Sequence, residues 1–322
     1  MIQKLCIWSF ISIVFLSCKP DEILLQKPDV NKDNLLISLS MQSNYEDQVW
    51  FCLAEGKEVY RNKKMAWDIQ FSCIGNNYIF LNSSLVMKAS VTNFTNWTDV
   101  NSGNGLKFTH DHSSGNKDSL AIGKAEDVLN KIIVIDRGFD VLGNPLGLIK
   151  FQVKAVNNQK YTIQFGAINS STGTEVEIIK NPDYVTVSFS LNDAKTLLLE
   201  PMPAAYDIVF TQYTHSFYNP YTPYLVTGVL SNRKNTKVAE ITTKAYELIT
   251  LEDTKNLVFT DSLDAIGYDW KTYSFDTQSF TTHSQKVYII QTQKNDIFKL
   301  QFLDFYNDQG IKGYPLFNLQ QL

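Results

Sequence analysis

The sequence is poor in the residues that build metal centres and disulfide frameworks, with four cysteines and four histidines in 322 residues. Two cysteines lie near the N-terminus, which leaves Cys52 and Cys73 in the body of the chain. They lack CxxC spacing and a nearby histidine, so no zinc site is expected. They could pair in an oxidising compartment, but the sequence leaves this open because it does not give the distance between their Cα atoms.

Clustered positive charge and enzyme signatures are also missing. The formal net charge is −4, and the densest basic cluster is RNKK at residues 61–64. We expect no nucleic-acid partner, because phosphate neutralisation needs a concentrated cationic face. The chain has no G-x-S-x-G, no Gly-rich phosphate loop and no HExxH, so the sequence predicts a binding protein and no enzyme.

Long apolar runs are absent except at the N-terminus, where Lys4 precedes LCIWSFISIVFLS. This pattern is typical of an export signal and is too short for a spanning helix. The residues before Cys18 resemble a lipobox, although Leu16 lies one place closer to the cysteine than usual, and a polar, proline-spaced segment follows. We predict a lipoprotein signal peptide at 1–17, an acylated Cys18 and a flexible tether at 18–36; a plain secretory signal is the alternative.

The remainder of the sequence predicts an all-β protein. Short alternating runs rich in Tyr, Phe, Thr, Val and Ile are separated by Asn, Asp, Gly and Lys turns. The clearest predicted strands lie at residues 161–168, 185–191, 286–293 and 298–305, and KNDIF between the last two predicts a tight hairpin. Long helical periodicity is absent.

Two halves of the chain carry the same pattern. A strand with a central Phe, a polar turn and a second apolar stretch precede WDIQF at 67–71 and YDIVF at 206–210. We therefore predict two related antiparallel β-modules, at 37–181 and 182–322. Side chains alternate along a strand, so Asp68 and Asp207 face away from their apolar neighbours. We expect each carboxylate either to cap a local turn or to accept backbone N–H bonds at a strand edge.

These strands, together with YLVTGVLSNR (224–233), AIGYDWK (265–271) and the C-terminal segment 287–317, resemble the HmuY-like lipoproteins of the Bacteroidetes. The resemblance implies an all-β fold, haem capture at the outer membrane and delivery to an uptake receptor. The best-known haem-binding member holds iron between two histidines. Relatives are thought to use two methionines instead. Neither pair can be placed on matching positions of this sequence, so no axial ligand is carried over.

One segment combines aromatic walls with an iron ligand. In FTQYTHSFYNPYTPY, His215 is surrounded by tyrosines that include Tyr213, Tyr218 and Tyr221. A porphyrin needs aromatic walls and one or two axial ligands, so this segment is the predicted haem site. The alternative is that the tyrosines pack over the sheet while His215 bonds a backbone carbonyl.

A second candidate for metal or haem contact is FTHDHSSGN. On a strand, His110 and His112 would share a face and could bind one metal ion, whereas in a loop the same spacing indicates only a solvated polar turn. The leading hypothesis is a haem-binding outer-membrane lipoprotein. The alternative is a surface lipoprotein whose tyrosines stack on glycans or on a partner protein, without haem.

Overall fold

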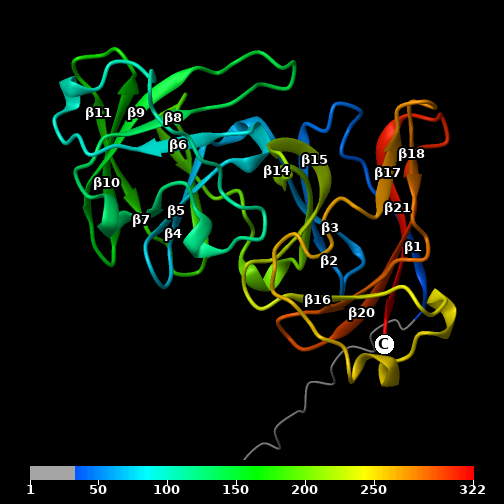
Figure 1. Cartoon of the computed structure of the whole chain (residues 1–322). Coiled ribbons are helices and arrows are strands. Elements are labelled where there is room, and N and C mark those ends of the chain that lie inside the picture. Colours follow the sequence, from blue (N-terminus) through cyan, green and yellow to red (C-terminus); the bar gives the residue numbers. More distant parts are fainter. Residues whose placement is uncertain (1–32) are drawn as a thin grey trace, which may run out of the picture. The chain divides into compact units, whose positions relative to one another are not determined.

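The computed structural model describes residues 33–322, which form two β-sandwiches (Figure 1). The predicted signal peptide, Cys18 and most of the predicted tether lie outside the described residues. In the described part the helical elements are short 3-10 turns of three or four residues. The all-β prediction is confirmed, and each clear strand predicted from the sequence is present as β10, β12, β19 or β20.

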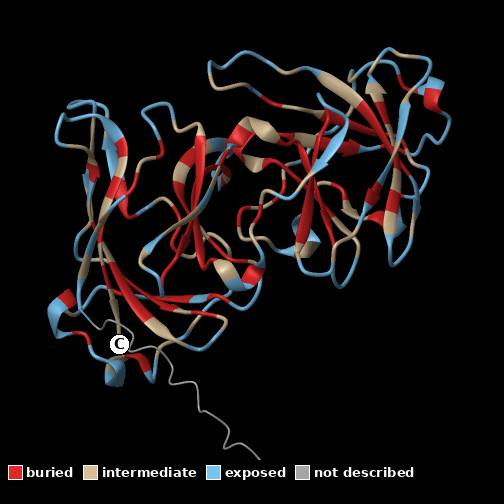
Figure 2. Ribbon diagram, turned by 180° about the vertical axis from the view of Figure 1, so that it is seen from behind, coloured by how far each residue is buried: buried red, intermediate tan, exposed pale blue. Residues whose placement is uncertain are grey.

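The first sandwich consists of two antiparallel five-stranded sheets. One sheet has the order β13-β12-β4-β5-β7 and the other β11-β10-β9-β8-β6. Their strands are β4 (Ile69–Ser72), β5 (Tyr78–Leu81), β6 (Lys88–Val91), β7 (Gly123–Lys124), β8 (Ile133–Asp136), β9 (Leu148–Val156), β10 (Lys160–Ala167), β11 (Thr174–Ile179), β12 (Thr186–Ser190) and β13 (Lys195–Leu197). The inner faces share one apolar core, in which Phe71, Phe151 and Phe189 are fully buried (Figure 2).

The second sandwich pairs a four-stranded sheet, β15-β14-β2-β3, with a five-stranded sheet, β1-β21-β20-β19-β16. Its strands are β1 (Leu35–Ser38), β2 (Asp47–Cys52), β3 (Lys57–Lys63), β14 (Ile208–Tyr218), β15 (Tyr221–Ser231), β16 (Lys237–Ile241), β19 (Val287–Gln291), β20 (Ile297–Tyr306) and β21 (Lys312–Gln321). A separate hairpin joins β17 (Lys271–Ser274) to β18 (Ser279–Thr282). A second apolar core contains Phe210, Phe302 and Phe317.

The short 3-10 turns connect these strands. They are η1 (Lys64–Ala66), η2 (Ser83–Leu85), η3 (Trp97–Asp99), η4 (Lys117–Ser119), η5 (Ala125–Val128), η6 (Pro203–Ala205), η7 (Tyr246–Leu248) and η8 (Leu251–Thr254). Two of them lie at matching points of the two halves, since η1 precedes the first Asp-Ile-x-Phe motif and η6 precedes the second.

The two halves of the sequence exchange a strand. β2 carries Phe51 but pairs with β14, whereas β12 carries Phe189 and pairs with β4. The strands β1–β3 of the predicted first module thus lie in the second sandwich, and β12–β13 of the predicted second module lie in the first. The sequence-based boundary at 181/182 therefore cuts across both sandwiches. The alternation of side chains along a strand predicts which face of the sheet each residue occupies, but it does not predict which strand pairs with which.

The repeated aspartates anchor this exchange. Asp68 Oδ2 accepts the backbone N–H of Leu191 at 2.8 Å, and Asp207 Oδ2 accepts that of Leu53 at 2.8 Å. Each carboxylate thus binds the chain just beyond the exchanged strand, as the sequence predicted. In addition, Arg137 donates to Asp68 Oδ1 at 2.8 Å.

Two buried lysines also match between the sandwiches. Lys150 Nζ donates to the carbonyl oxygen of Trp97 at 2.9 Å and lies over its ring. Lys299 Nζ donates to the carbonyl oxygens of Tyr246 and Ile249 at 2.8 and 3.0 Å and lies over the Tyr246 ring. Each amine thus binds a carbonyl oxygen of a short 3-10 turn, Trp97 at the start of η3 or Tyr246 at the start of η7.

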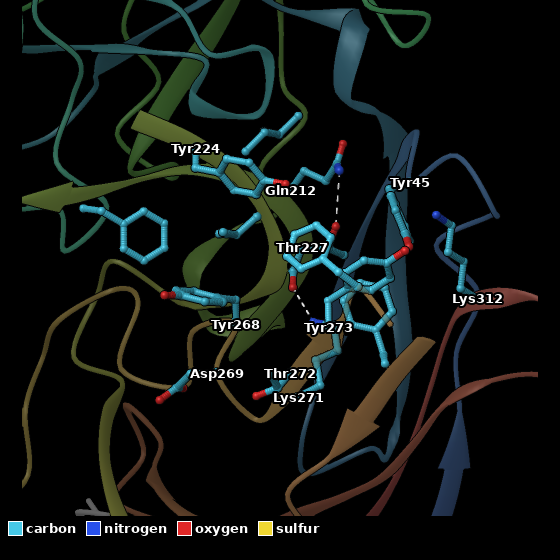
Figure 3. Close-up of a pocket in the computed structure, with 15 residues that line it drawn as sticks. Tyr45, Gln212, Tyr224, Thr227, Tyr268, Asp269, Lys271, Thr272, Tyr273 and Lys312 are labelled. Atoms are coloured by element: carbon cyan, nitrogen blue, oxygen red, sulfur yellow. Dashed lines mark hydrogen bonds between the residues drawn. The ribbon is translucent and has the colours of Figure 1, made fainter. Parts of the chain in front are cut away.

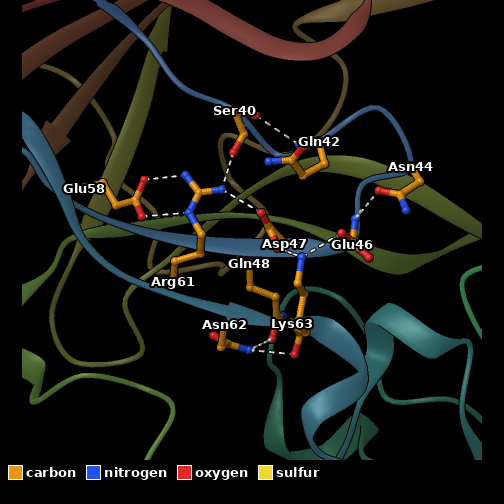
Figure 4. A network of polar contacts seen from close by, with 10 residues as sticks. All are labelled: Ser40, Gln42, Asn44, Glu46, Asp47, Gln48, Glu58, Arg61, Asn62 and Lys63. Atoms are coloured by element: carbon orange, nitrogen blue, oxygen red, sulfur yellow. Dashed lines mark hydrogen bonds and ion pairs between the residues drawn. The ribbon is translucent and has the colours of Figure 1, made fainter.

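A charged network secures the β2–β3 hairpin (Figure 4). The Arg61 guanidinium donates to Asp47 at 2.7 Å, to the Ser40 carbonyl oxygen at 2.6 Å and to the Glu58 carboxylate. Burial alone would raise the pKa of Asp47, but hydrogen bonds from Lys63 and Arg61 outweigh it and lower that pKa. The network holds the segment before β2 against the second sandwich.

The two cysteines of the body lie in different sandwiches. Cys52 ends β2 and Cys73 follows β4, and both are free and buried. The disulfide left open by the sequence is therefore not formed. Burial raises the pKa of both thiols.

Candidate functional site

The hairpin β14–β15 extends well beyond its sheet. β14 pairs with β2 only over Ile208–Phe210, whereas it pairs with β15 along its full length to Tyr218. Eleven-residue strands rich in Thr, Tyr, Phe and Val favour such a ribbon, because these side chains pack well across strands. The extension carries most of the aromatic segment that the sequence singled out.

The predicted site residues are distributed unevenly along this ribbon. Tyr213 is only 1% exposed and belongs to the interior, while Tyr218 and Tyr221 at the tip are 61% and 53% exposed. The two tip rings face each other with centroids 6.0 Å apart. The aromatic segment thus includes one core residue and an exposed tip.

An aromatic cavity of about 700 Å³ lies beside the ribbon, between it and the β17–β18 hairpin (Figure 3). Seven aromatic rings line it: Tyr45, Phe217, Tyr224, Tyr268, Tyr273, Phe275 and Phe280. The ring of Tyr273 contacts those of Phe275 and Phe280 at centroid distances of 5.2 and 5.0 Å. These contacts give the cavity a continuous aromatic wall on the β17–β18 side.

Charged groups also reach this cavity. Lys271 is 5% exposed, and its Nζ donates to the Thr227 carbonyl oxygen at 2.5 Å while lying 4.0 Å from the Trp270 ring centroid. Burial lowers the pKa of Lys271 to about 7, against a smaller opposing effect of Asp269. Lys312 lines the cavity as well. A ligand with flat aromatic parts and carboxylates would find both kinds of partner here.

His215 stands directly behind two walls of the cavity. Its ring lies 4.9 Å from that of Phe217 and 5.0 Å from that of Tyr268, centroid to centroid. Its Nδ1 is 3.5 Å from Ser113 Oγ, a hydroxyl from the first sandwich. Burial lowers the pKa of His215; Asp264 opposes this and His112 adds to it. The imidazole is thus neutral at pH 7, the form that coordinates metals.

His110 and His112 have different partners. His110 Nδ1 is 3.0 Å from the Met87 carbonyl oxygen, and burial lowers the pKa of this histidine. His112 Nδ1 is 2.8 Å from Ser114 Oγ, and its ring stacks on Tyr218 at 6.2 Å. Within residues 33–322 no group of three or more His, Cys, Asp or Glu side chains could hold a metal ion. The structure associates His112 with the tip of the ribbon.

The comparison with protein families gives a clear result. The family described as HmuY protein matches residues 44–319, which includes nearly all of both sandwiches. The chain belongs to the HmuY family. No curated protein matches it.

Solved structures similar to this HmuY-family chain are distant in sequence. Apo PinO from Porphyromonas gingivitis is 10% identical, with a TM-score of 0.28, over 90% of this chain and 97% of that one. A candidate HmuY-like haem-binding protein from Bacteroides vulgatus is 8% identical, with a TM-score of 0.25, over 91% and 93%. A candidate lipoprotein from Bacteroides fragilis is 12% identical, with a TM-score of 0.26, over 52% and 92%.

Sequence reasoning about this HmuY-family chain missed half of the cavity. Tyr268 and Lys271 lie in AIGYDWK, a segment used for the family resemblance and not for the site, and Phe275 and Phe280 follow it. The available signal was a second cluster of aromatic residues close to a lysine. In the described residues no helix is long and apolar enough to cross a membrane.

Proposed function

We propose that this protein is a lipid-anchored, outer-membrane binding protein that captures a tetrapyrrole, namely haem, in the aromatic cavity and transfers it to an uptake receptor. The cavity of about 700 Å³ lined by seven aromatic rings carries the proposal. Its volume falls within the roughly 300–1,000 Å³ of small-molecule sites. Membership of the HmuY family supports the same ligand class.

The residues present fit most of a haem molecule. The rings of Phe217 and Tyr268 offer stacking faces for the macrocycle. Lys312 offers an ammonium group for its carboxylates, and Lys271, with its pKa lowered to about 7, offers an amine that a bound carboxylate would help to keep protonated. No His, Cys or Met side chain lines this cavity, which is built entirely from residues 45–312 of the described part. The iron ligand therefore has to come from outside the wall.

His215 is the proposed ligand because it is the imidazole in contact with that wall. Coordination requires the Phe217 ring, which is 42% exposed, to turn away from the imidazole. His112, which stacks on Tyr218, is a second imidazole near the ribbon and would be a further candidate for holding the iron. His110 remains a weaker candidate, because its Nδ1 already bonds the Met87 carbonyl oxygen.

The test is a titration of the full chain with haemin and with metal-free protoporphyrin IX. We expect one-to-one binding of both, and a shifted Soret band for haemin. Phe217→Ala and Tyr268→Ala should each weaken both ligands about tenfold, because stacking contributes about 0.5–1.5 kcal/mol beyond area burial. Phe94→Ala, at a half-exposed aromatic in the first sandwich, is the matched control and should change nothing. Absence of binding by both porphyrins would refute the proposal.

The iron ligand is tested separately. His215→Ala should alter the haemin spectrum and leave the affinity for protoporphyrin IX unchanged, since only the metal complex uses the imidazole. An unchanged haemin spectrum would remove His215 as the ligand while leaving the cavity in place.

A second candidate function rests on the tip of the ribbon. Tyr218 and Tyr221 are more than half exposed and, unlike the similarly exposed Tyr224, do not line the cavity. This arrangement suits stacking on sugars or on a partner protein at the cell surface. The double substitution Tyr218→Ala and Tyr221→Ala should then abolish adhesion without affecting porphyrin binding; unchanged adhesion would reject this function.

The anchor is tested by Cys18→Ala, which should move the protein from the membrane fraction to the soluble one, because acyl chains supply the membrane affinity. Continued membrane association after this substitution would contradict lipidation at Cys18.

A further inference from the structure

A second cavity, of about 510 Å³, is lined by polar residues from both sandwiches. The first sandwich contributes the loop 114–117 and the second contributes residues 232–237 and 260–263. It shares no lining residue with the aromatic cavity. Its wall holds three cationic side chains, Lys117, Arg233 and Lys237, and one carboxylate, Asp261.

Two of these cations are held against the same aromatic ring. Lys117 Nζ lies 4.4 Å and Arg233 Cζ 4.5 Å from the centroid of Phe80. The cation–π contacts orient the ammonium and the guanidinium group and leave their N–H donors available for another partner. Phe80 therefore acts as a platform that brings one cation from each sandwich into the same cavity.

Within residues 33–322, neither Lys117 nor Arg233 donates a hydrogen bond to a carboxylate. Among the described residues no hydrogen bond or ion pair is formed by the Lys117 ammonium, and the carboxylate oxygen closest to Arg233 is Glu200 Oε2, 4.0 Å from Nε. That oxygen already accepts the Thr186 hydroxyl at 2.7 Å. The buried Asp111 carboxylate nearby is also engaged, since both of its oxygens accept backbone N–H groups.

The electrostatics favour an added anion. Burial, with a contribution from the neighbouring Arg233, lowers the pKa of Lys117 to about 8, so the ammonium form still dominates at pH 7. Glu200 and Asp111 offset part of the repulsion between these two adjacent, partly desolvated cations, and an anion placed between the cations would offset more of it. Arginine binds phosphate through two parallel N–H bonds, and lysine adds a point charge.

The rest of the lining indicates what carries this anion. It consists of hydroxyl and amide side chains, from Ser114, Asn116, Asn235, Thr236, Thr260 and Ser262, with Leu263 as its apolar member. We propose that this cavity binds a sugar phosphate, whose phosphate contacts Lys117 and Arg233 and whose hydroxyls contact Asp261 and the polar wall. This site is independent of the proposed porphyrin site.

The test is calorimetric titration of the full chain at pH 7 with glucose 6-phosphate, inorganic phosphate and glucose. We expect glucose 6-phosphate to bind more tightly than inorganic phosphate, and glucose at least about tenfold more weakly than its phosphate, since charge-assisted hydrogen bonds dominate. Inorganic phosphate binding as tightly as the ester would overturn the role of the hydroxyl-rich wall. Equal binding of glucose, or no binding of either phosphate compound, would overturn the whole site.

Variants assign the binding to the named residues. Arg233→Gln and Lys117→Gln should each weaken glucose 6-phosphate at least about tenfold. Lys195→Gln, at an exposed lysine on β13 that does not line the cavity, is the matched control and should leave the affinity unchanged. If Arg233→Gln or Lys117→Gln fails to fold, Lys237→Gln at the exposed rim of the cavity tests the same site. It should weaken glucose 6-phosphate binding about threefold. Binding that survives these changes would refute the assignment, whatever the haemin titration shows.

Discussion

The two sandwiches share the same pattern of aspartate and asparagine hydrogen bonds, but their matching hairpins differ greatly in length. In each, an Asp-Ile-x-Phe strand opens a hairpin, and an asparagine closes it. Asn82 Nδ2 donates to the Trp67 carbonyl oxygen and Asn232 Nδ2 to that of Tyr206, both at 2.8 Å. The hairpin β4–β5 has strands of four residues, whereas those of β14–β15 have eleven.

This difference places the candidate binding site. The residues common to both hairpins lie at the end held by the aspartate and the asparagine, where they serve the sheets. The additional length of β14–β15 lies beyond β2, and there Phe217 and Tyr224 become walls of the aromatic cavity. One copy of the repeat thus remains structural, and the other gains a surface by extending two strands.

The largest expected effect separates the two repeated aspartates. Asp68→Ala leaves Arg137 without its ion pair, and we expect a loss of about 3–5 kcal/mol in the free energy of unfolding. Asp207 forms no ion pair among the described residues, so Asp207→Ala should cost only about 1–3 kcal/mol. Urea unfolding measures both, with exposed Asp193→Ala as the control. Equal losses would show that Arg137 adds nothing.

The next effect is confined to the second sandwich and depends on pH. Lys271 has its pKa lowered by burial from 10.5 to about 7 in the folded protein. Between these two pKa values the unfolded chain binds more protons at Lys271 than the folded protein does. The free energy of unfolding therefore rises with pH, by about 2 kcal/mol from pH 7 to pH 9. Lys271→Met should remove this rise. A variant that keeps the same pH dependence would assign it to another group.

The buried lysines should behave alike in both sandwiches. Lys150→Met and Lys299→Met each leave backbone carbonyl oxygens without a donor, and we expect about 1.5 kcal/mol of destabilisation for each. Thermal or urea unfolding measures the pair, and Lys195→Met on exposed β13 is the control. A difference above about 1 kcal/mol between the two variants would break the equivalence of the sandwiches.

The smallest effect is expected at the tip of the ribbon. Tyr221→Ala should change the free energy of unfolding by less than about 0.5 kcal/mol, because the ring is more than half exposed. Tyr213→Ala, on the same hairpin but fully buried, should cost about 3–5 kcal/mol. Urea unfolding of both variants shows how far along the ribbon the side chains contribute to stability. A large loss of unfolding free energy in Tyr221→Ala would show that the tip also stabilises the protein.

Much of the site was outside the reach of local patterns. The sequence located the aromatic ribbon and His215, but it grouped the buried Tyr213 with the exposed Tyr218, because alternation does not say how far a strand runs beyond its sheet. It also paired His110 with His112 by spacing, whereas the structure stacks His112 on Tyr218 from the other sandwich. Such contacts depend on how segments that are far apart in the sequence pack against each other.

The sequence by itself determined the β-strands, the internal repeat and the resemblance to the HmuY family. It also indicated a structural role for Asp68 and Asp207. Each of these depends on residues close together in the chain. Only the tertiary structure decided that β2 and β12 change places, and that segments 217–227 and 268–280 face each other across a cavity. Strand pairing satisfies backbone hydrogen bonds that are identical for every sequence, so the choice of partner comes from burying side chains across the whole molecule.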